Sequence, residues 1–448
     1  MNESRLNIKA TILLSFGFFA STIAWSVYNA YVPQILEGFI TSTALIGLVM
    51  TIDNVFGVIF QPLFGSLSDK TRTRFGRRMP YVFIGLPICV AAFILVPYMS
   101  SLWSLMLVLI IFTFVMSAWR TPAVSLMPDI TPGPLRSQAN GIVNFMGGVG
   151  SLFAFLAGGI LFNMWLARTG NGFPAPFMMS AAMMLLALVV MALFVREPKH
   201  ACEPVEENPK PDSKSEISNK SENSDKLKMK LSDVKKLKQD EKKSLLLILF
   251  GIFFWFTGYN AVETFFTLYA TNTLGMTPGD ASMTLSIFSL TFLAFAIPAG
   301  FIGAKTGRRK AILIGLTGLT VLFFPMIFIA NAWLTRACLF LAGFFWAFVN
   351  INSLPMIVRL SGDAKIGTFI GIYYFFSFSS QIISPVLFGF IRDVVGHYKV
   401  LFLYACIAFV LAMLSLFFVR HGEDEAKTED VQPTPKYNGM EASSLSSM

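Results

Sequence analysis

Residues 65–80 read Gly65-Ser-Leu-Ser-Asp69-Lys-Thr-Arg72-Thr-Arg74-Phe-Gly76-Arg77-Arg78-Met-Pro80, between two long apolar stretches. A shorter copy, Gly300-Phe-Ile-Gly-Ala304-Lys-Thr-Gly307-Arg308-Arg309-Lys310, also stands between apolar stretches, and it repeats the Gly-Arg-Arg triplet of the first. The whole chain has 448 residues, 54% hydrophobic and 14% charged. Soluble domains are about 45–50% apolar and about 25% charged. The composition therefore excludes a disordered chain, a collagen and an ordinary soluble enzyme.

Apolar stretches long enough to cross a membrane recur along the whole chain. A bilayer core about 30 Å thick takes roughly 20 apolar helical residues. The first stretch is too long for a signal-peptide core of about 7–15 residues, so we interpret it as a span. Twelve spans are predicted, at about 10–34, 44–67, 80–100, 103–127, 138–165, 177–195, 245–271, 281–303, 311–331, 333–357, 366–390 and 399–419.

The distribution of Lys and Arg predicts the orientation. With the N-terminus inside, inner segments hold 30 of the 35 basic residues. This bias follows the positive-inside rule, so the net charge of +9 reflects topology and not a nucleic-acid partner. We expect an all-α, multi-pass protein of the plasma or inner membrane, with both termini in the cytoplasm.

The spans divide into two sets of six. We predict an N-terminal half at 1–196, a cytoplasmic linker at 197–243, a C-terminal half at 244–422 and a disordered tail at 423–448. The end of the linker, 226–243, carries Leu and Val at helical spacing among Lys residues; it is either an amphipathic helix on the inner leaflet or a solvated linker. Tyr28-Asn29-Ala30 recurs as Tyr259-Asn260-Ala261, at the same offset along the chain as the two Gly-Arg-Arg triplets. Duplicated halves are typical of secondary transporters, and one chain would hold a complete pathway as a monomer.

Residues 65–80 resemble the signature between the second and third helices of the major facilitator superfamily. With Gln61-Pro62 ahead of it, the stretch is similar to the sucrose-transporter branch, related to the glycoside–pentoside–hexuronide cation symporters. This resemblance implies a proton-coupled symporter of a disaccharide or glycoside that works by alternating access. Gln61 and Gly57 stand where melibiose-type members carry cation-binding aspartates, which disfavours a sodium site of that type.

Two other functions stay open as alternatives. A major facilitator exporter of drugs or metabolites would use the same fold, because direction depends on gradients. A membrane enzyme or a receptor is disfavoured, because no His lies within a span and the two intramembrane acids lie in different halves. No metal or cofactor is expected, since the four Cys form no ligand pattern.

Asp53, Arg120 and Glu263 are the formally charged residues well inside spans. Burying each one costs at least about 2.5–3.5 kcal/mol on insertion scales, so each is a candidate functional residue. Two acids and one base leave one acid without a partner. We predict that Asp53 or Glu263 carries a coupling proton; the alternative is a fixed Asp53–Arg120 pair with Glu263 in an aqueous vestibule.

Polar and aromatic side chains recur at i, i+4 spacing on several spans, and they are our candidates for substrate binding. Amides and Arg can hydrogen-bond hydroxyl groups, and flat aromatic rings can cover the C–H faces of a sugar. The alternative is that the amides join helices and the Trp residues anchor the interface. The candidates are Trp25, Asn29, Arg120, Asn144, Tyr259, Asn260, Trp346, Asn350 and Gln381.

A second group of charges lies at the inner ends of the spans, and we predict that it forms a cytoplasmic gate. Asp69 is expected to cap a neighbouring helix N-terminus, where the dipole favours an anion. Asp129 is expected to meet Arg77 or Arg78 in one conformation only, although a plain loop turn is the alternative. The predicted gate residues are Asp69, Arg77, Arg78, Asp129 and Arg136.

Overall fold

The computed structural model describes residues 6–132, 135–195, 197, 239–361 and 366–419. Its helices are α1 (Ile8–Glu37), α2 (Thr43–Met50), α3 (Ile52–Lys70), α4 (Met79–Leu95), α5 (Leu102–Ile130), α6 (Arg136–Thr169), α7 (Pro174–Phe194), α10 (Gln239–Leu274), α11 (Pro278–Thr306), α12 (Arg308–Phe323), α13 (Ala332–Ser361), α14 (Ile366–Val395) and α15 (Val400–Phe417). Short 3₁₀ turns, η1 (Val96–Tyr98) and η4 (Pro325–Ile327), extend α4 and α12.

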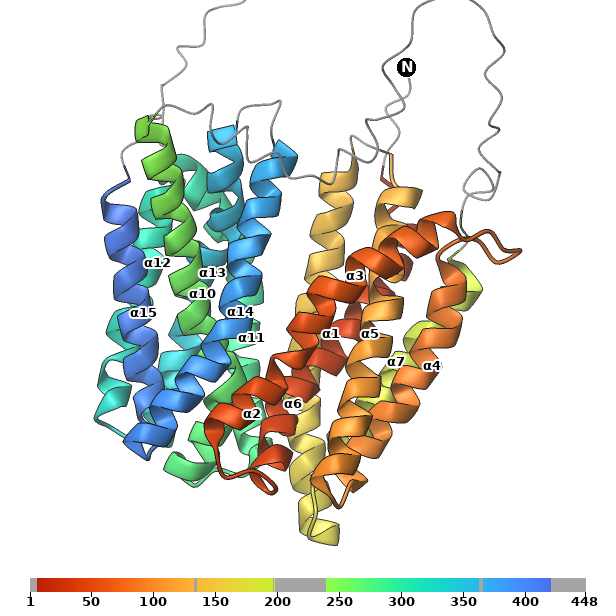
Figure 1. The fold of residues 1–448 in the computed structure, drawn as a ribbon, viewed down its shortest axis with the longest axis horizontal. Helices are drawn as coiled ribbons and strands as arrows, with labels where there is room; N and C mark the ends of the chain where they lie inside the picture. The colour runs from red at the N-terminus through yellow and green to blue at the C-terminus, as the bar shows by residue number, and fades with distance from the viewer. Residues whose placement is uncertain (1–5, 133–134, 196, 198–238, 362–365, 420–448) are drawn as a thin grey trace, which may run out of the picture.

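Within the described residues, twelve helical segments are long and apolar enough to cross a membrane, which confirms the predicted fold class. Helices α1–α7 form one bundle and α10–α15 form a second, with α2 leaning from the first toward the second (Figure 1). We call the face that carries residues 70–79 the inner face and the face that carries residues 396–399 the outer face.

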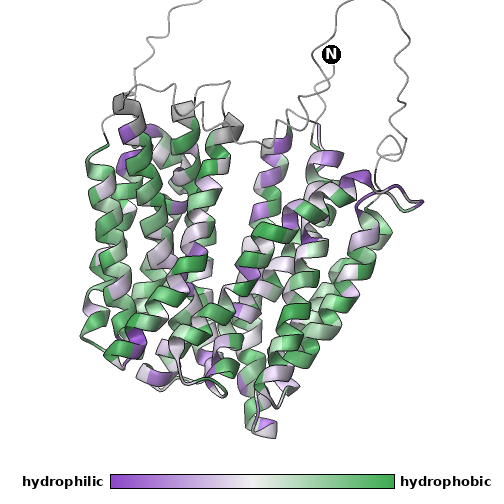
Figure 2. Cartoon of the chain, viewed as in Figure 1, coloured by the Kyte–Doolittle hydropathy of each residue, from purple (hydrophilic) through white to green (hydrophobic). Residues whose placement is uncertain are grey.

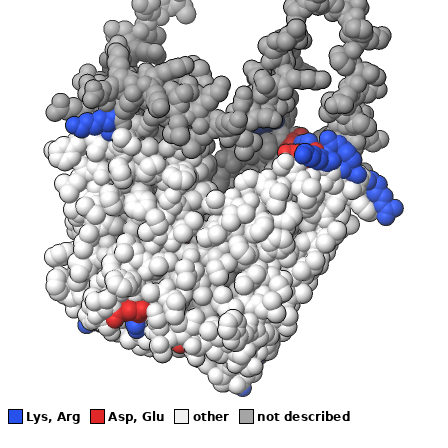
Figure 3. All heavy atoms as spheres, in the orientation of Figure 1, with Lys and Arg blue, Asp and Glu red and all other residues white. Residues whose placement is uncertain are grey.

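An apolar belt surrounds both bundles. The outward-facing ribbons are mostly hydrophobic along their length (Figure 2). Charged side chains on the visible surface gather at the inner and outer ends, with uncharged residues between them (Figure 3). This distribution fits a bilayer, because lipid tails offer nothing to solvate a charge.

Local capping explains where several helices begin. The side chain of Ser42 accepts the backbone N–H of Leu45 at the start of α2, and Ser101 accepts that of Ser104 at the start of α5. Thr277 accepts the N–H of Asp280 at the start of α11. Such hydroxyl caps satisfy N–H groups that have no partner inside the helix.

The second span differs from the sequence prediction of one helix at 44–67. The structure divides it at Thr51 into α2 and α3. The Thr51 hydroxyl donates to the carbonyl of Leu48 at 2.8 Å, and a carboxylate oxygen of Asp53 accepts the backbone N–H of Asn54 at 2.7 Å. Polar side chains that bond to nearby backbone compete with the helical ladder, and here they mark the break.

The predicted amphipathic segment at 226–243 lies almost wholly outside the described residues. The structure describes the chain again from Gln239, where α10 begins. The apolar part of α10 and that of α1 are the most buried among the twelve spans. These two helices therefore form the centres of the two bundles, at equivalent places in the repeat.

Close packing inside the first bundle depends on Gly85 of α4. A Cβ added at Gly85 would lie 2.7 Å from the Cβ of Trp119 on α5, and Trp119 is fully buried. Overpacking a core in this way typically costs about 1–3 kcal/mol.

We expect Gly85→Ala to lower the thermal unfolding temperature of the detergent-purified protein. The matched control is Gly371→Ala in α14, where an added Cβ meets no atom within 4 Å. Fluorescence-detected melting should place Gly371→Ala at or slightly above the parent, because Ala is the better helix former. Equal melting of both variants would contradict the packing assignment.

Candidate functional site

A cavity of about 1230 Å³ lies between the two bundles. It begins near the inner ends of α6, α11 and α13, at Asn140, Ala304 and Pro355, and it reaches Glu263 in the outer half of α10. The bundles diverge toward the inner face (Figure 1). The cavity is therefore open to the inner side.

Contacts between the bundles close the outer side. The side-chain amide of Gln34 donates to the Thr271 hydroxyl at 3.1 Å, and the amide of Asn272 donates to the carboxylate of Glu37 at 3.0 Å. These bonds join the outer ends of α1 and α10. The cavity is thus open at the inner face and closed at the outer face, an arrangement that we call inward-open.

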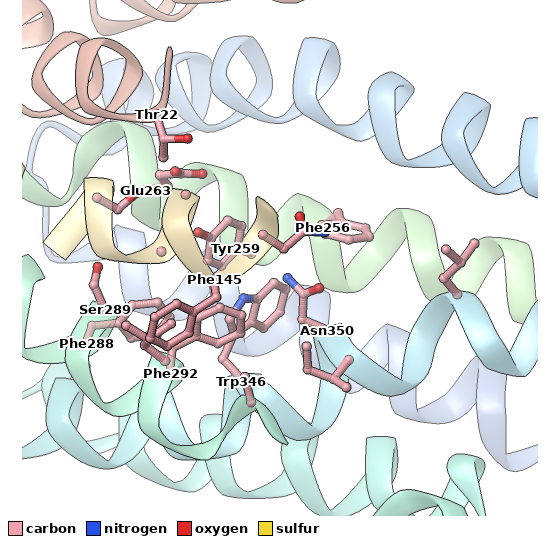
Figure 4. Close-up of a pocket in the computed structure, with 18 of the residues that line it drawn as sticks. Thr22, Phe145, Phe256, Tyr259, Glu263, Phe288, Ser289, Phe292, Trp346 and Asn350 are labelled. Carbon is pink, nitrogen blue, oxygen red and sulfur yellow. The ribbon is translucent and has the colours of Figure 1, made fainter. Parts of the chain in front are cut away.

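Aromatic rings form one wall of the cavity. The rings of Tyr259 and Trp346 stack face to face, with centroids 4.2 Å apart and planes 4° from parallel. Phe288 packs beside Tyr259 at 6.3 Å, and Phe256 meets Trp346 edge-on at 5.9 Å. Phe145 and Phe292 also extend into this space (Figure 4). The wall is apolar and presents several flat surfaces.

The structure brings most of the predicted binding residues together. Asn29 and Asn260 lie outside the lining of the cavity. Asn260 donates to the Ser380 hydroxyl at 3.3 Å and so joins α10 to α14, which was the alternative interpretation for the amides. The predicted residues that line the cavity are Trp25, Arg120, Asn144, Tyr259, Glu263, Trp346, Asn350 and Gln381.

Three intramembrane charges lie in or next to the cavity. Arg120, in the inner half of α5, and Glu263, in the outer half of α10, line it, whereas Asp53, near the start of α3, does not. Asp53 interacts electrostatically with both Arg120 and Glu263, and the side chains of Asn29 and Tyr259 lie next to the Glu263 carboxyl. None of the ion pairs between described residues involves Arg120. A fixed Asp53–Arg120 pair is therefore not formed in this conformation, and the two acids have one cation near them.

The charges at the inner face form a compact network within the first bundle. Arg77 donates to one oxygen of Asp129 at 2.6 Å, and Arg78 donates to the other at 3.0 Å. Arg78 also pairs with Asp69 at 2.5 Å. Asp129, which was predicted to meet Arg77 or Arg78, contacts both here, and its role as a gate stays a prediction. Arg136 instead donates to backbone oxygens of Pro128 and Thr131 at the end of α5.

The expected cap by Asp69 is absent from this conformation, because Asp69 is paired with Arg78. Glu197, just after α7, takes that place at the start of α4. Its carboxylate accepts the backbone N–H groups of Arg77, Arg78 and Met79 at 2.7, 2.7 and 2.9 Å. Gly76 allows this turn with a φ of 105°, where a side chain would be strained. Sequence reasoning missed Glu197, although an acid next to the end of a span was a visible signal.

Sequence reasoning also missed much of the aromatic wall. Phe145, Phe288 and Phe292 resemble ordinary apolar span residues in the sequence, and only the 288/292 spacing marks a common helix face. Thr22 and Ser289 add hydroxyl groups to the lining. In a chain with 46 Phe, side-chain type alone does not separate cavity from lipid-facing positions.

Twelve spans in two bundles around one inward-open cavity define a secondary transporter rather than an enzyme. The family model of the Major Facilitator Superfamily matches residues 14–279 and 248–440. The chain belongs to this superfamily, and it is a multi-pass protein of the cell membrane.

Several curated relatives have names that refer to resistance. The multidrug resistance protein MdtG of Proteus mirabilis is 27% identical over 198 residues, 43% of this chain and 49% of that protein. The chain thus spans about half the length of the MdtG relatives that it matches. The tetracycline resistance protein, class E, of Escherichia coli is 24% identical over 414 residues, 90% of this chain and 93% of that protein.

Solved structures share the fold. A bacterial homologue of the human lysosomal transporter Spinster, inward-facing and occupied, has a TM-score of 0.66 at 14% identity and covers 92% of this chain and 95% of its own. The nucleoside transporter NupG has a TM-score of 0.67 at 13% identity, with 91% and 98% covered. The sucrose-type branch expected from residues 61–80 finds no support among these relatives.

We expect Glu197→Ala to destabilise the protein by about 0.5–2 kcal/mol, the usual range for loss of a helix cap. The measurement is thermal melting in detergent. Glu197→Gln is the matched variant, because its amide oxygen still accepts N–H groups while the charge is lost. Its melting temperature should lie between those of the wild type and Glu197→Ala. Wild-type melting of Glu197→Ala would show that the cap contributes nothing.

Proposed function

We propose that this chain is an exporter of apolar, ring-containing compounds that is driven by proton exchange. The observation that carries the proposal is the aromatic wall of an inward-open cavity with the carboxyl group of Glu263 in its outer part. Drug-sized ligands typically fill cavities of about 300–1,000 Å³ that are mostly apolar with a few polar groups. This cavity, at about 1230 Å³, has room for a bulky compound.

The wall suits a flat hydrophobic compound better than a strongly hydrated one. Ring pairs in offset or edge-on contact contribute about 0.5–1.5 kcal/mol beyond the area that they bury. Phe145, Phe288 and Phe292 offer such contacts on one side, with Ser289 and Asn350 as hydrogen-bonding groups nearby (Figure 4). The names of the MdtG and tetracycline-resistance relatives agree with this class of substrate.

Glu263 and Asp53 are the groups that we assign to proton exchange. When the cavity is open to the outside, one of these two buried acids binds a proton from the outer side. When the cavity is open to the inside, Arg120 favours the charged acid, the proton leaves to the cytoplasm and substrate enters. The Glu263 carboxyl lines the cavity next to Tyr259, so the proposed proton site and the substrate space adjoin.

Sugar symport is a second candidate because of two observations. Residues 61–80 resemble the sucrose-transporter branch, and the amides of Asn144, Asn350 and Gln381 line the cavity. The face-to-face stack of Tyr259 on Trp346 weighs against it, since each ring covers one face of the other and half of the sugar-binding surface is lost.

Transport by the wild-type protein distinguishes the two candidates. We expect everted membrane vesicles with an acid interior to accumulate ethidium, a flat aromatic dye, and a protonophore to abolish this accumulation. Proteoliposomes with an inward proton gradient should take up neither radiolabelled sucrose nor maltose. Gradient-driven sugar uptake without dye transport would reverse the order of the two candidates.

The role of Glu263 is tested by Glu263→Gln, which keeps the shape of the side chain and removes the titrating group. We expect proton-driven dye accumulation to fall to the level of vesicles without the protein. Glu263→Asp retains an acid and should keep measurable accumulation. Dye binding, followed by fluorescence polarisation of the purified variants, should survive in both. Unchanged accumulation in Glu263→Gln would remove Glu263 from the proton pathway and leave Asp53 as the candidate.

A further inference from the structure

The outer end of α14 is hydrogen-bonded to the start of α2 across the boundary between the bundles. The carboxylate of Asp393 accepts the Ser42 hydroxyl at 2.7 Å and the backbone N–H groups of Thr43 and Ala44 at 2.8 and 3.0 Å. Ser42 is itself the N-cap residue of α2. A carboxylate at a helix N-terminus satisfies free N–H groups and meets the positive end of the helix dipole.

A second contact of the same kind joins α6 to the start of α11. The Thr277 hydroxyl, which caps α11, donates to the side-chain oxygen of Asn163 at 2.8 Å. The side-chain amide of Asn163 donates to Asp280 in the first turn of α11 at 2.9 Å. Here a residue of the first bundle holds the helix start of the second, which is the reverse of the Asp393 contact.

The two contacts correspond residue by residue. Positions 155, 159 and 163 of α6 match positions 385, 389 and 393 of α14 at one constant offset, while 42, 44 and 47 match 277, 279 and 282 at another. In one contact Gly159 lies against Gly279, and in the other Gly389 lies against Thr43 and Ala44. The Ser282 hydroxyl donates to the Phe155 carbonyl at 3.0 Å, and Gly47 lies against the carbonyl of Pro385.

We propose that these paired contacts form an outer latch, with Asp393 and Asn163 as its equivalent positioning residues, which holds the inward-open conformation. Asp393 is the stronger member, because its carboxylate accepts three donors at the start of α2, whereas Asn163 makes two hydrogen bonds at the start of α11. The inner-face ion pairs of Arg77 and Arg78 lie within one bundle. The outer latch, by contrast, joins the two bundles and must break when the outer side opens.

Neighbouring charges support the Asp393 contact. Arg392 donates to the Asp393 carboxylate at 3.3 Å and lies over the ring of Tyr398, 4.3 Å from its centroid. The Tyr398 hydroxyl donates to Glu37 of α1 at 3.1 Å, and burial raises the pKa of Tyr398 well above its usual value. The phenol therefore stays protonated and connects the loop after α14 to the first bundle.

The test measures the distance between the bundles at the outer face. Cysteines replace Ser100, between η1 and α5, and Ala330, between η4 and α13, after the native Cys89, Cys202, Cys338 and Cys406 are removed. Both positions are exposed and lie away from the latch. Double electron–electron resonance between spin labels then reports the populations of closed and open outer sides. The measurement needs no substrate, so its outcome is independent of the proposed export function.

Asp393→Asn should raise the ratio of open to closed outer sides by roughly tenfold, which corresponds to the loss of about one charged hydrogen bond. Asn163→Ala should raise it less, and the double variant should exceed either one. Ser42→Ala is a milder variant, because it removes the hydroxyl donor to Asp393 and keeps the two backbone N–H donors. It should also raise the ratio of open to closed outer sides, and it replaces Asp393→Asn in the test if that variant does not fold.

The control is Asn331→Ala. Asn331 caps α13 through the N–H groups of Trp333 and Leu334, so the same capping chemistry lies within one bundle. The distance between the two spin labels in Asn331→Ala should match that in the parent protein. An unchanged distance distribution in both Asp393→Asn and Ser42→Ala would overturn the proposal, as would an equal shift in Asn331→Ala.

Discussion

A bilayer core supplies no hydrogen-bond partner, so each backbone N–H and C=O within it must be satisfied by the protein itself. This constraint makes the spans helical and confines irregular backbone to places where protein groups replace the lost bonds. The break between α2 and α3 is such a place, because Thr51 and Asp53 supply local bonds. The helix start at Thr43 is another, because its backbone N–H bonds to Asp393 of the opposite bundle. At the start of α11, the capping hydroxyl of Thr277 bonds to Asn163 of the opposite bundle. Two helix starts at the outer face are thus points where the bundles hold each other.

The sequence predicted the number of spans, because a run of about 20 apolar residues has few other uses. It also offered Arg77 or Arg78 as a partner of Asp129, because opposite charges at the inner ends of neighbouring spans lie close together, and Asp129 contacts both. It did not predict Asp393 or Asn163. Their partners lie 351 and 114 residues away, and a short polar side chain near the end of a span resembles any loop residue.

The sequence predicted the function less well than the fold, and the structure explains the difference. The stretch at residues 65–80 resembles a sugar-transporting branch, yet its side chains bond to one another and to Asp129, and its backbone N–H groups bond to Glu197, all at the inner face. None of these residues lines the cavity. The motif therefore lies at the inner face, apart from the cavity that a transported compound would occupy. The cavity wall is built from Phe, Tyr and Trp residues that are spread over α6, α10, α11 and α13, where composition gives no signal.

The broken second span leaves α2 as an eight-residue helix that belongs to the first bundle by chain order and packs mainly against α14 of the second. Its joint at Thr51 lies toward the outer face, on the opposite side from the opening of the cavity. A blocking molecule bound over this joint would therefore not compete with a compound in the cavity. Changes in the cavity wall would leave the binding of such an inhibitor unaffected.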